Sequence, residues 1–326
     1  MLLLSGRVGK APRGLSTTEL EPALRNALFR LIAARFPTHR ISRSRALAAI
    51  WRSLFYTLRP TEPFLMRTQY YRLWAHPRRG TLTRAIIRRG HWEPEETREF
   101  ARFIRAGDFV IDAGANFGHY TFTAAQLVGP AGLVIGFEPH PDMFKLLAAN
   151  AALQNRMNIV VEQAGLGSES GMLEITTDLG NPGGHSFVRQ NVRQRGADLA
   201  VAVHTIDAYL RRTGLADRPL SLIKIDVQGF EAKVIAGAAA AITRHRPVVL
   251  CEVTPAALAQ TGDSLETLLA FFQAMDYVAS PIGAGDGGRT LGYDRLAALL
   301  QTSGREYWDV LFIPRERAQS ISQTAN

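Results

Sequence analysis

The fold class follows from residues 109–121, which read FVIDAGANFGHYT. The apolar run ends at Asp112, and a helix is predicted from Tyr120 to Val128. Gly114 and Gly118 allow a tight turn and a close approach of the backbone to a ligand. The start of the helix offers backbone N–H groups to an anionic group. We therefore expect a strand, a ligand-binding turn and a helix, which together begin an α/β domain.

Apolar strands alternate with helices along the rest of the chain. Further strands are predicted at 133–139, 158–167, 220–229, 246–253, 277–282 and 308–314. Helices are predicted at 142–153, 230–242 and 265–275, with a long polar loop between the third and fourth strands. This alternation predicts a doubly wound, Rossmann-like α/β fold with a mainly parallel seven-stranded sheet. Such a sheet binds its ligand beyond the carboxyl ends of the strands.

The chain is predicted to have two parts. Residues 1–62 form a basic N-terminal helical extension, with helices at 21–35 and 44–58. Residues 63–326 form the main domain, whose core spans 94–314. Within it, a strand or short hairpin is predicted at 64–75 and a helix at 94–104.

The positive charge is concentrated at the front of the chain. Residues 1–110 contain 21 Lys and Arg against 8 Asp and Glu, whereas the remainder contains 17 against 21. A basic face attracts phosphates, anionic lipid or nucleic acid, and a solvated surface in an arginine-rich chain is the simpler reading. Nucleic acid is not the expected partner, because no recognition motif accompanies the charge. Weak membrane-surface contact and homo-oligomer formation stay open.

The location expected for this chain is the cytoplasm. No apolar run of 18 residues predicts a transmembrane helix, and the apolar start precedes its positive charge, the reverse of a secretory signal. Cys251 is the single cysteine, so no internal disulfide is possible. Histidines and cysteines form no cluster at metal-ligand spacing, and no metal is predicted.

The turn favours S-adenosylmethionine over a dinucleotide as the ligand. Its spacing, D-x-G-x-N-x-G from Asp112, differs from the G-x-G-x-x-G of dinucleotide sites. Asp112 can face a cationic amino group, while the helix start can bind a carboxylate. Glu138, which closes the second strand, can accept both ribose hydroxyls of an adenosyl group. The predicted cofactor-binding residues are Asp112, Gly114, Asn116, Gly118, Thr121, Glu138 and Ala164.

Three side chains are the candidates for acceptor chemistry. Asp226 emerges at the carboxyl end of the fourth strand, although it could instead cap the following helix. Glu252 ends the fifth strand, so neighbouring strands would bring the two carboxylates within roughly 5–10 Å. Such a pair could share a proton, orient an acceptor hydroxyl or hold a divalent ion. His185, in the polar loop 178–192, suits a general base, or is simply solvated.

The motifs together resemble the FkbM-type methyltransferases. The segments DAGANFGHYTF, GFEPHP, IKIDVQGFE and VVLCEV occur in that order, and the resemblance covers roughly residues 90–314. It implies the class I methyltransferase fold, S-adenosylmethionine as cofactor, and methylation of hydroxyl groups on sugars or natural products. The family pattern more often has glutamate at the position of Gln228, which can hydrogen-bond an acceptor but cannot take its proton.

Two other functions are alternatives to O-methylation of a sugar, glycolipid or natural product. A nucleotide-dependent oxidoreductase would use a related sheet, but no Tyr-x-x-x-Lys pair supports it. A non-catalytic binding protein on the same fold is disfavoured by the intact donor motif, while Gln228 leaves it open. The acceptor, a small molecule or a glycan- or lipid-linked group, is not specified by the sequence.

Overall fold

A computed structural model describes residues 64–75, 91–179, 184–284 and 290–318, together with positions 50, 53, 54, 57 and 86. The chain divides into two compact units, Met1–Glu93 and Pro94–Asn326. In the first unit, β1 (Phe64–Arg67) pairs antiparallel with β2 (Arg72–Ala75), which confirms the predicted hairpin. The helix predicted at 21–35 lies outside the described residues. Of the helix predicted at 44–58, only four positions are described, and all four are helical.

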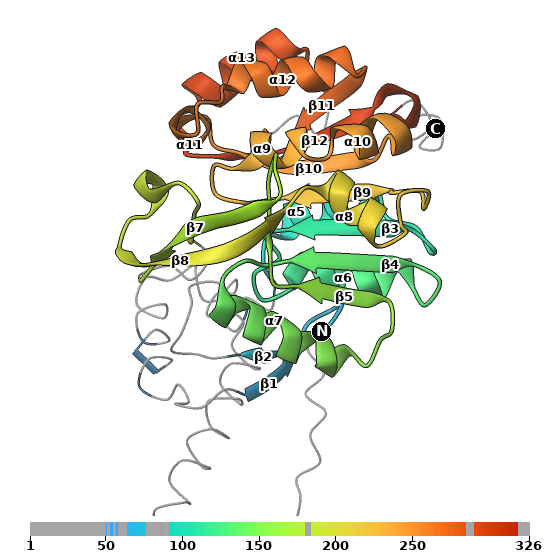
Figure 1. Cartoon of the computed structure of the whole chain (residues 1–326), viewed down its shortest axis with the longest axis vertical. Coiled ribbons are helices and arrows are strands. Elements are labelled where there is room, and N and C mark those ends of the chain that lie inside the picture. The colour runs from blue at the N-terminus through green and yellow to red at the C-terminus, as the bar shows by residue number, and fades with distance from the viewer. Residues whose placement is uncertain are drawn as a thin grey trace, which may run out of the picture. The chain divides into compact units, whose positions relative to one another are not determined.

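The second unit is built on a seven-stranded sheet (Figure 1). Across the sheet the strands are β11 (Tyr277–Pro281), β12 (Trp308–Pro314), β10 (Val248–Val253), β9 (Leu222–Ile225), β3 (Phe109–Ala113), β4 (Leu133–Phe137) and β5 (Ile159–Glu162). β12 runs antiparallel to both of its neighbours, β11 and β10, and the strands from β10 to β5 are parallel. The predicted fold class, a mainly parallel seven-stranded α/β sheet, is confirmed.

The strand order places the ligand-binding edge. From β3 the chain moves outward to β4 and β5, then returns to β9 on the opposite side of β3 and continues to β10. The order therefore reverses between β3 and β9, and ligands of open α/β sheets bind beyond the carboxyl ends of strands at such a switch point. The turn after β3 and the segment after β9 meet there.

Helices cover both faces of the sheet, so each strand buries side chains on both sides. Ile111 belongs to a core that includes residues of α8 (Ile206–Arg212), α10 (Ala239–His245) and α12 (Leu265–Ala274). Val110 belongs to a second core that includes residues of α5 (Pro94–Arg102) and α6 (His119–Val128). Alternation of side chains along a strand produces these two cores, and both are needed in a doubly wound fold. The remaining helices are α7 (Pro141–Gln154), α9 (Glu231–Ala236), α11 (Pro255–Gln260) and α13 (Tyr293–Thr302).

The prediction of a long polar loop between the third and fourth strands is wrong. It contains β7 (Gly171–Asp178) and β8 (Arg195–His204), an antiparallel pair that β6 (Gly165–Leu166) extends into a three-stranded sheet. The predicted third strand, 158–167, is accordingly divided between two sheets. In Figure 1 the arrowheads of β4 and β5 point toward the side on which β7 and β8 lie. The small sheet therefore flanks the ligand-binding edge.

The helix predicted at 230–242 is divided into α9 and α10. Gly237 lies at the division, where a Cβ would overlap the carbonyl oxygen of Gly167. A side chain would not fit there, because the loop after β6 approaches the backbone closely.

Among the described helices, none combines the length and the apolar character needed to span a bilayer. Cytoplasmic location and homo-oligomer formation stay predictions.

Candidate functional site

Asp112 ends β3 beneath the glycine-rich turn. Its side chain is buried, and its Oδ2 accepts a hydrogen bond from the Thr121 hydroxyl at 2.6 Å. Its Oδ1 accepts no hydrogen bond from the part of the chain that the structure describes. Burial raises the pKa of Asp112, while the Lys224 ammonium and the Thr121 hydroxyl oppose the rise. A buried acceptor without a donor suits a site that binds a cationic group.

The glycines of the turn are required by close contacts. Gly114 has φ +80°, and a Cβ there would overlap the backbone carbonyl oxygen of Asp226. Gly118 has φ +103°, and a Cβ there would overlap the Phe122 ring. Both positions combine a left-handed backbone with no room for a side chain. The turn after β3 thus packs directly against the segment after β9.

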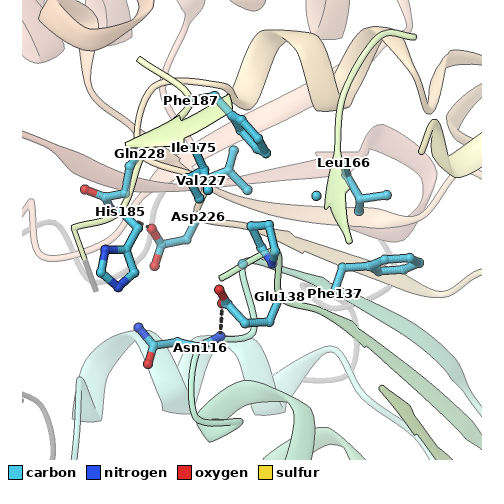
Figure 2. Close-up of a pocket in the computed structure, with 13 residues that line it drawn as sticks. Asn116, Phe137, Glu138, Leu166, Ile175, His185, Phe187, Asp226, Val227 and Gln228 are labelled. Atoms are coloured by element: carbon cyan, nitrogen blue, oxygen red, sulfur yellow. Dashed lines mark hydrogen bonds between the residues drawn. The ribbon is translucent and has the colours of Figure 1, made fainter. Parts of the chain in front are cut away.

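Glu138 is held by the backbone on two sides. Its Oε2 accepts the Asn116 N–H at 2.8 Å, drawn as a dashed line in Figure 2, and its Oε1 accepts the His140 N–H at 2.9 Å. Burial raises its pKa to about 7, although the two N–H donors favour the carboxylate. Two of the roughly four lone-pair sites of the carboxylate are used, so two remain for further donors.

A pocket opens at the switch point of the sheet (Figure 2). Its empty space, open solvent at the mouth included, is about 550 Å³. It is lined by Gly114, Asn116, Phe137, Glu138, Pro139, Gly165, Leu166, Ile175, His185, Phe187, Asp226, Val227 and Gln228. Figure 2 shows His185 and Asp226 toward one end and Phe137 and Leu166 toward the other, with Glu138 between them. The pocket therefore has a polar end and an apolar end.

The predicted site residues divide into two groups. Those that line the pocket are Gly114, Asn116, Glu138, His185 and Asp226. The others, which do not line it, are Asp112, Gly118, Thr121, Ala164 and Glu252. Thr121 is fully buried, and its hydroxyl is hydrogen-bonded to Asp112. Ala164 is buried and precedes the lining residue Gly165.

Asp226 lies in a row of polar side chains. Its Oδ2 forms an ion pair with the buried Lys224 ammonium at 2.9 Å, and its Oδ1 accepts the Gln228 amide at 2.9 Å. The Lys224 ammonium also lies 4.8 Å from the Tyr120 ring centroid. Asp226 does not cap α9; the Glu231 carboxylate accepts the backbone N–H groups of that turn instead. The Asp226 side chain is about one third exposed and faces the pocket.

Glu252 is the penultimate residue of β10, which lies next to β9 as the sequence predicted. Its Oε1 accepts a hydrogen bond from the Gln228 amide at 3.1 Å. In the strand register, Glu252 lies opposite Asp309 on β12. Burial raises the pKa of Glu252 well above its usual value, and the carboxylates of Asp226 and Asp309 raise it further. Glu252 is therefore poised to keep a proton beside the Asp226 carboxylate.

His185 is fixed by two contacts. Its Nδ1 accepts the Asp178 N–H at 2.8 Å, and its ring stacks on His140 with centroids 3.8 Å apart. A neutral imidazole that accepts at Nδ1 carries its proton at Nε2, so this ring presents a donor. Burial, and then His140, lower the pKa of His185 to about 4. The ring is thus suited to donate a hydrogen bond rather than to take a proton.

Several lining residues were missed by the sequence interpretation. Leu166 lies on β6, at the end of the strand predicted at 158–167. Ile175 lies on β7, which the sequence did not reveal as a strand, and Phe187 lies in the polar segment that follows it. Gln228 was noted only as a departure from the family pattern, yet its amide joins two carboxylates. The apolar residues Leu166 and Phe187 within a polar stretch were the available signal.

The residues that line the pocket fit an adenosyl cofactor. No group of three or more His, Cys, Asp or Glu in the described residues is arranged to hold a metal ion. Glu138 retains two acceptor sites at the wall for a ribose diol, and Leu166 and Phe187 offer an apolar surface for an aromatic base. The apolar end therefore suits adenine, and the residues present fit the cofactor.

Three solved structures give a measure of similarity. The chain is 14% identical to a methyltransferase FkbM from Methylobacillus flagellatus, with a TM-score of 0.38, covering 90% of this chain and 60% of that one. It is 13% identical to a SAM-dependent O-methyltransferase from Thermotoga maritima, with a TM-score of 0.36 and coverage of 80% and 81%. It is 12% identical to Aeropyrum pernix fibrillarin with bound S-adenosylmethionine, with a TM-score of 0.37 and coverage of 67% and 76%.

A family model identifies the chain more directly. Curated proteins give no match to the sequence. The model of the methyltransferase FkbM domain matches residues 112–279, which is just over half of the chain. The match begins at Asp112 and includes Glu138 and Asp226, the two carboxyl groups that line the pocket. The chain belongs to the FkbM family of S-adenosylmethionine-dependent methyltransferases.

Proposed function

We propose that this protein transfers a methyl group from S-adenosylmethionine to a hydroxyl group of a sugar, glycolipid or natural product. The observation that carries the proposal is the meeting of two motifs in one pocket. Glu138 and Asn116, at the ends of β4 and β3, share that pocket with Asp226 at the end of β9. A donor-binding carboxylate and a carboxylate facing the acceptor are thus separated by the width of a single pocket.

The donor would be held mainly by the β3 and β4 ends. Glu138 offers its two remaining lone-pair sites to the ribose hydroxyls, and Gly114 and Asn116 form the adjoining wall. Asp112 supports this wall with a buried carboxyl group that accepts a hydrogen bond from Thr121, and Gly118 lies at the start of α6. Ala164 closes the wall behind Gly165. These residues bind and orient the donor without taking part in bond breaking.

The acceptor would be handled at the polar end. When bound, the cofactor supplies an electrophilic methyl group whose bonding electron pair stays on sulfur as the methyl leaves. Asp226 accepts the proton of the acceptor hydroxyl as the hydroxyl oxygen forms its bond to the methyl carbon. Lys224 holds the Asp226 carboxylate in place, and His185 donates a hydrogen bond from Nε2 to orient the acceptor. Glu252 stands behind Asp226 and keeps its own proton.

The experiment that tests this function uses methyl-labelled S-adenosylmethionine with a panel of hydroxyl-bearing sugars, glycolipids and polyketides. The proposal predicts label in a methyl ether, which survives alkali. Amine and carboxylic acid acceptors in the same panel serve as controls. Label found in an alkali-labile ester, on nitrogen or on carbon would contradict the O-methylation proposed here.

A further inference from the structure

Gln228 lies between the two carboxylates of the polar end. Its Nε2 donates to Asp226 Oδ1 at 2.9 Å and to Glu252 Oε1 at 3.1 Å. The two protons of one amide nitrogen therefore serve carboxyl groups from two adjacent parallel strands, β9 and β10. An ionised carboxylate only accepts hydrogen bonds. The nitrogen of the Gln228 amide, and not its oxygen, must therefore face an ionised Asp226.

The backbone of Gln228 is fixed from the opposite side. Its φ is +54°, in the left-handed region that is strained for a residue with a side chain. Its carbonyl oxygen accepts the Ser186 hydroxyl at 2.8 Å and the Asn191 amide at 2.9 Å. The segment that follows His185 thus compensates the strained conformation and holds the side chain in one direction.

The amide lies among several acidic side chains. Asp226 already neutralises Lys224, and Glu252 has Asp309 opposite it on β12. Buried Glu231 adds another carboxyl group to the surroundings of Glu252. Gln228 supplies two hydrogen-bond donors at this point without adding charge, and its nitrogen fills the space between the two carboxyl groups. Oxygen ligands around such a space are what Mg²⁺ or Mn²⁺ would otherwise bind.

We propose that Gln228 is a positioning residue: its amide bridges Asp226 to Glu252 and occupies the place in which a divalent cation would hold them. The bridge fixes the Asp226 carboxylate toward the pocket and links it, through the Gln228 carbonyl, to the segment that carries His185. This inference rests on the proposed function, because it takes Asp226 as the group that accepts the proton.

The first test converts the bridge into a cation site. Gln228→Glu exchanges the amide for a carboxylate at nearly constant shape and places three carboxyl groups around one point. We expect this variant to bind Mn²⁺ in titration calorimetry and the wild type to bind none. Gln260→Glu, at the exposed end of α11, makes the same charge change elsewhere and should bind none. A Gln228→Glu protein that retains S-adenosylmethionine binding, and is therefore folded, but gains no Mn²⁺ site would overturn the inference.

The second test keeps the side chain neutral. Gln228→Met preserves length and removes both donors, and loss of hydrogen bonds to charged groups predicts a fall in kcat of about 10- to 100-fold. Because the residues proposed to bind the methyl donor lie at the ends of β3 and β4, the affinity for S-adenosylmethionine should change less than twofold. A variant that loses kcat and donor affinity together, or that keeps its kcat, would refute the positioning role. The Mn²⁺ titration needs no acceptor, so absent methyl transfer in the wild type would count against the proposed function and leave that test decisive.

Discussion

Replacing Glu138 with glutamine should change how stability depends on pH. Burial raises the pKa of Glu138 to about 7 from an ordinary value of 4.5. Because the pKa of Glu138 is higher in the folded than in the unfolded state, its stabilising contribution to the free energy of unfolding is fully present below pH 4.5. It is lost as the pH rises through 7. Since a tenfold difference in acid dissociation corresponds to about 1.4 kcal/mol, the total is about 3 kcal/mol, of which about 2.5 kcal/mol falls between pH 5 and 8.

Glutamine cannot ionise, so the variant should lack this dependence. It should also be less stable at pH 5 by about 1–3 kcal/mol, because its NH₂ group must face the N–H of Asn116 or His140. Urea unfolding from pH 5 to 8 should therefore show the wild type losing about 2.5 kcal/mol of unfolding free energy relative to the variant, which would bring the two close together or reverse their order at pH 8. Glu174→Gln, on the exposed part of β7, controls for the lost charge. A difference in unfolding free energy that stays constant across this range would refute the reasoning.

Three other substitutions test separate parts of the site. Asp226→Asn should lower kcat by about 100-fold, as expected for loss of a proton acceptor, and leave donor affinity unchanged; the exposed Asp217→Asn is its control, and undiminished turnover would remove Asp226 from the mechanism. Gly114→Ala should abolish donor binding and lower the unfolding free energy by at least about 1–2 kcal/mol, because its φ is +80° and its Cβ would overlap the Asp226 carbonyl; unchanged calorimetry and urea curves would contradict this. Lys224→Met should lower kcat and cost about 1–3 kcal/mol of stability, discounted for the partial exposure of Asp226, and an equally stable, equally active variant would show that the ion pair is dispensable.

The strands nearest the glycine-rich turn could be predicted because their signals are local. Phe109–Ala113 is an apolar run that ends in an acid and glycines, and Val248–Val253 repeats the pattern of a buried parallel strand. Gly171–Asp178 could not be recognised in the same way. Its first four residues are exposed, its partner Arg195–His204 lies far along the chain, and their pairing depends on contacts between distant segments.

The site shows the same division between local and distant information. The approach of Asp226 to Glu252 followed from placing two strands side by side. The proton position on His185 did not, because it is set by the Asp178 N–H and by stacking on His140. The direction of the Gln228 amide was equally hidden, since a loop more than 35 residues away in the sequence fixes its carbonyl.

Titration calorimetry with S-adenosylmethionine is the most direct test of the central claim, that this pocket binds the methyl donor through Glu138 and the turn after Asp112. NADH and NADPH serve as control ligands under the same conditions. The account predicts micromolar binding of S-adenosylmethionine, weakened at least about tenfold in Glu138→Gln, and no binding of either dinucleotide. Dinucleotide binding without S-adenosylmethionine binding, or a donor affinity unaffected by Glu138→Gln, would contradict it.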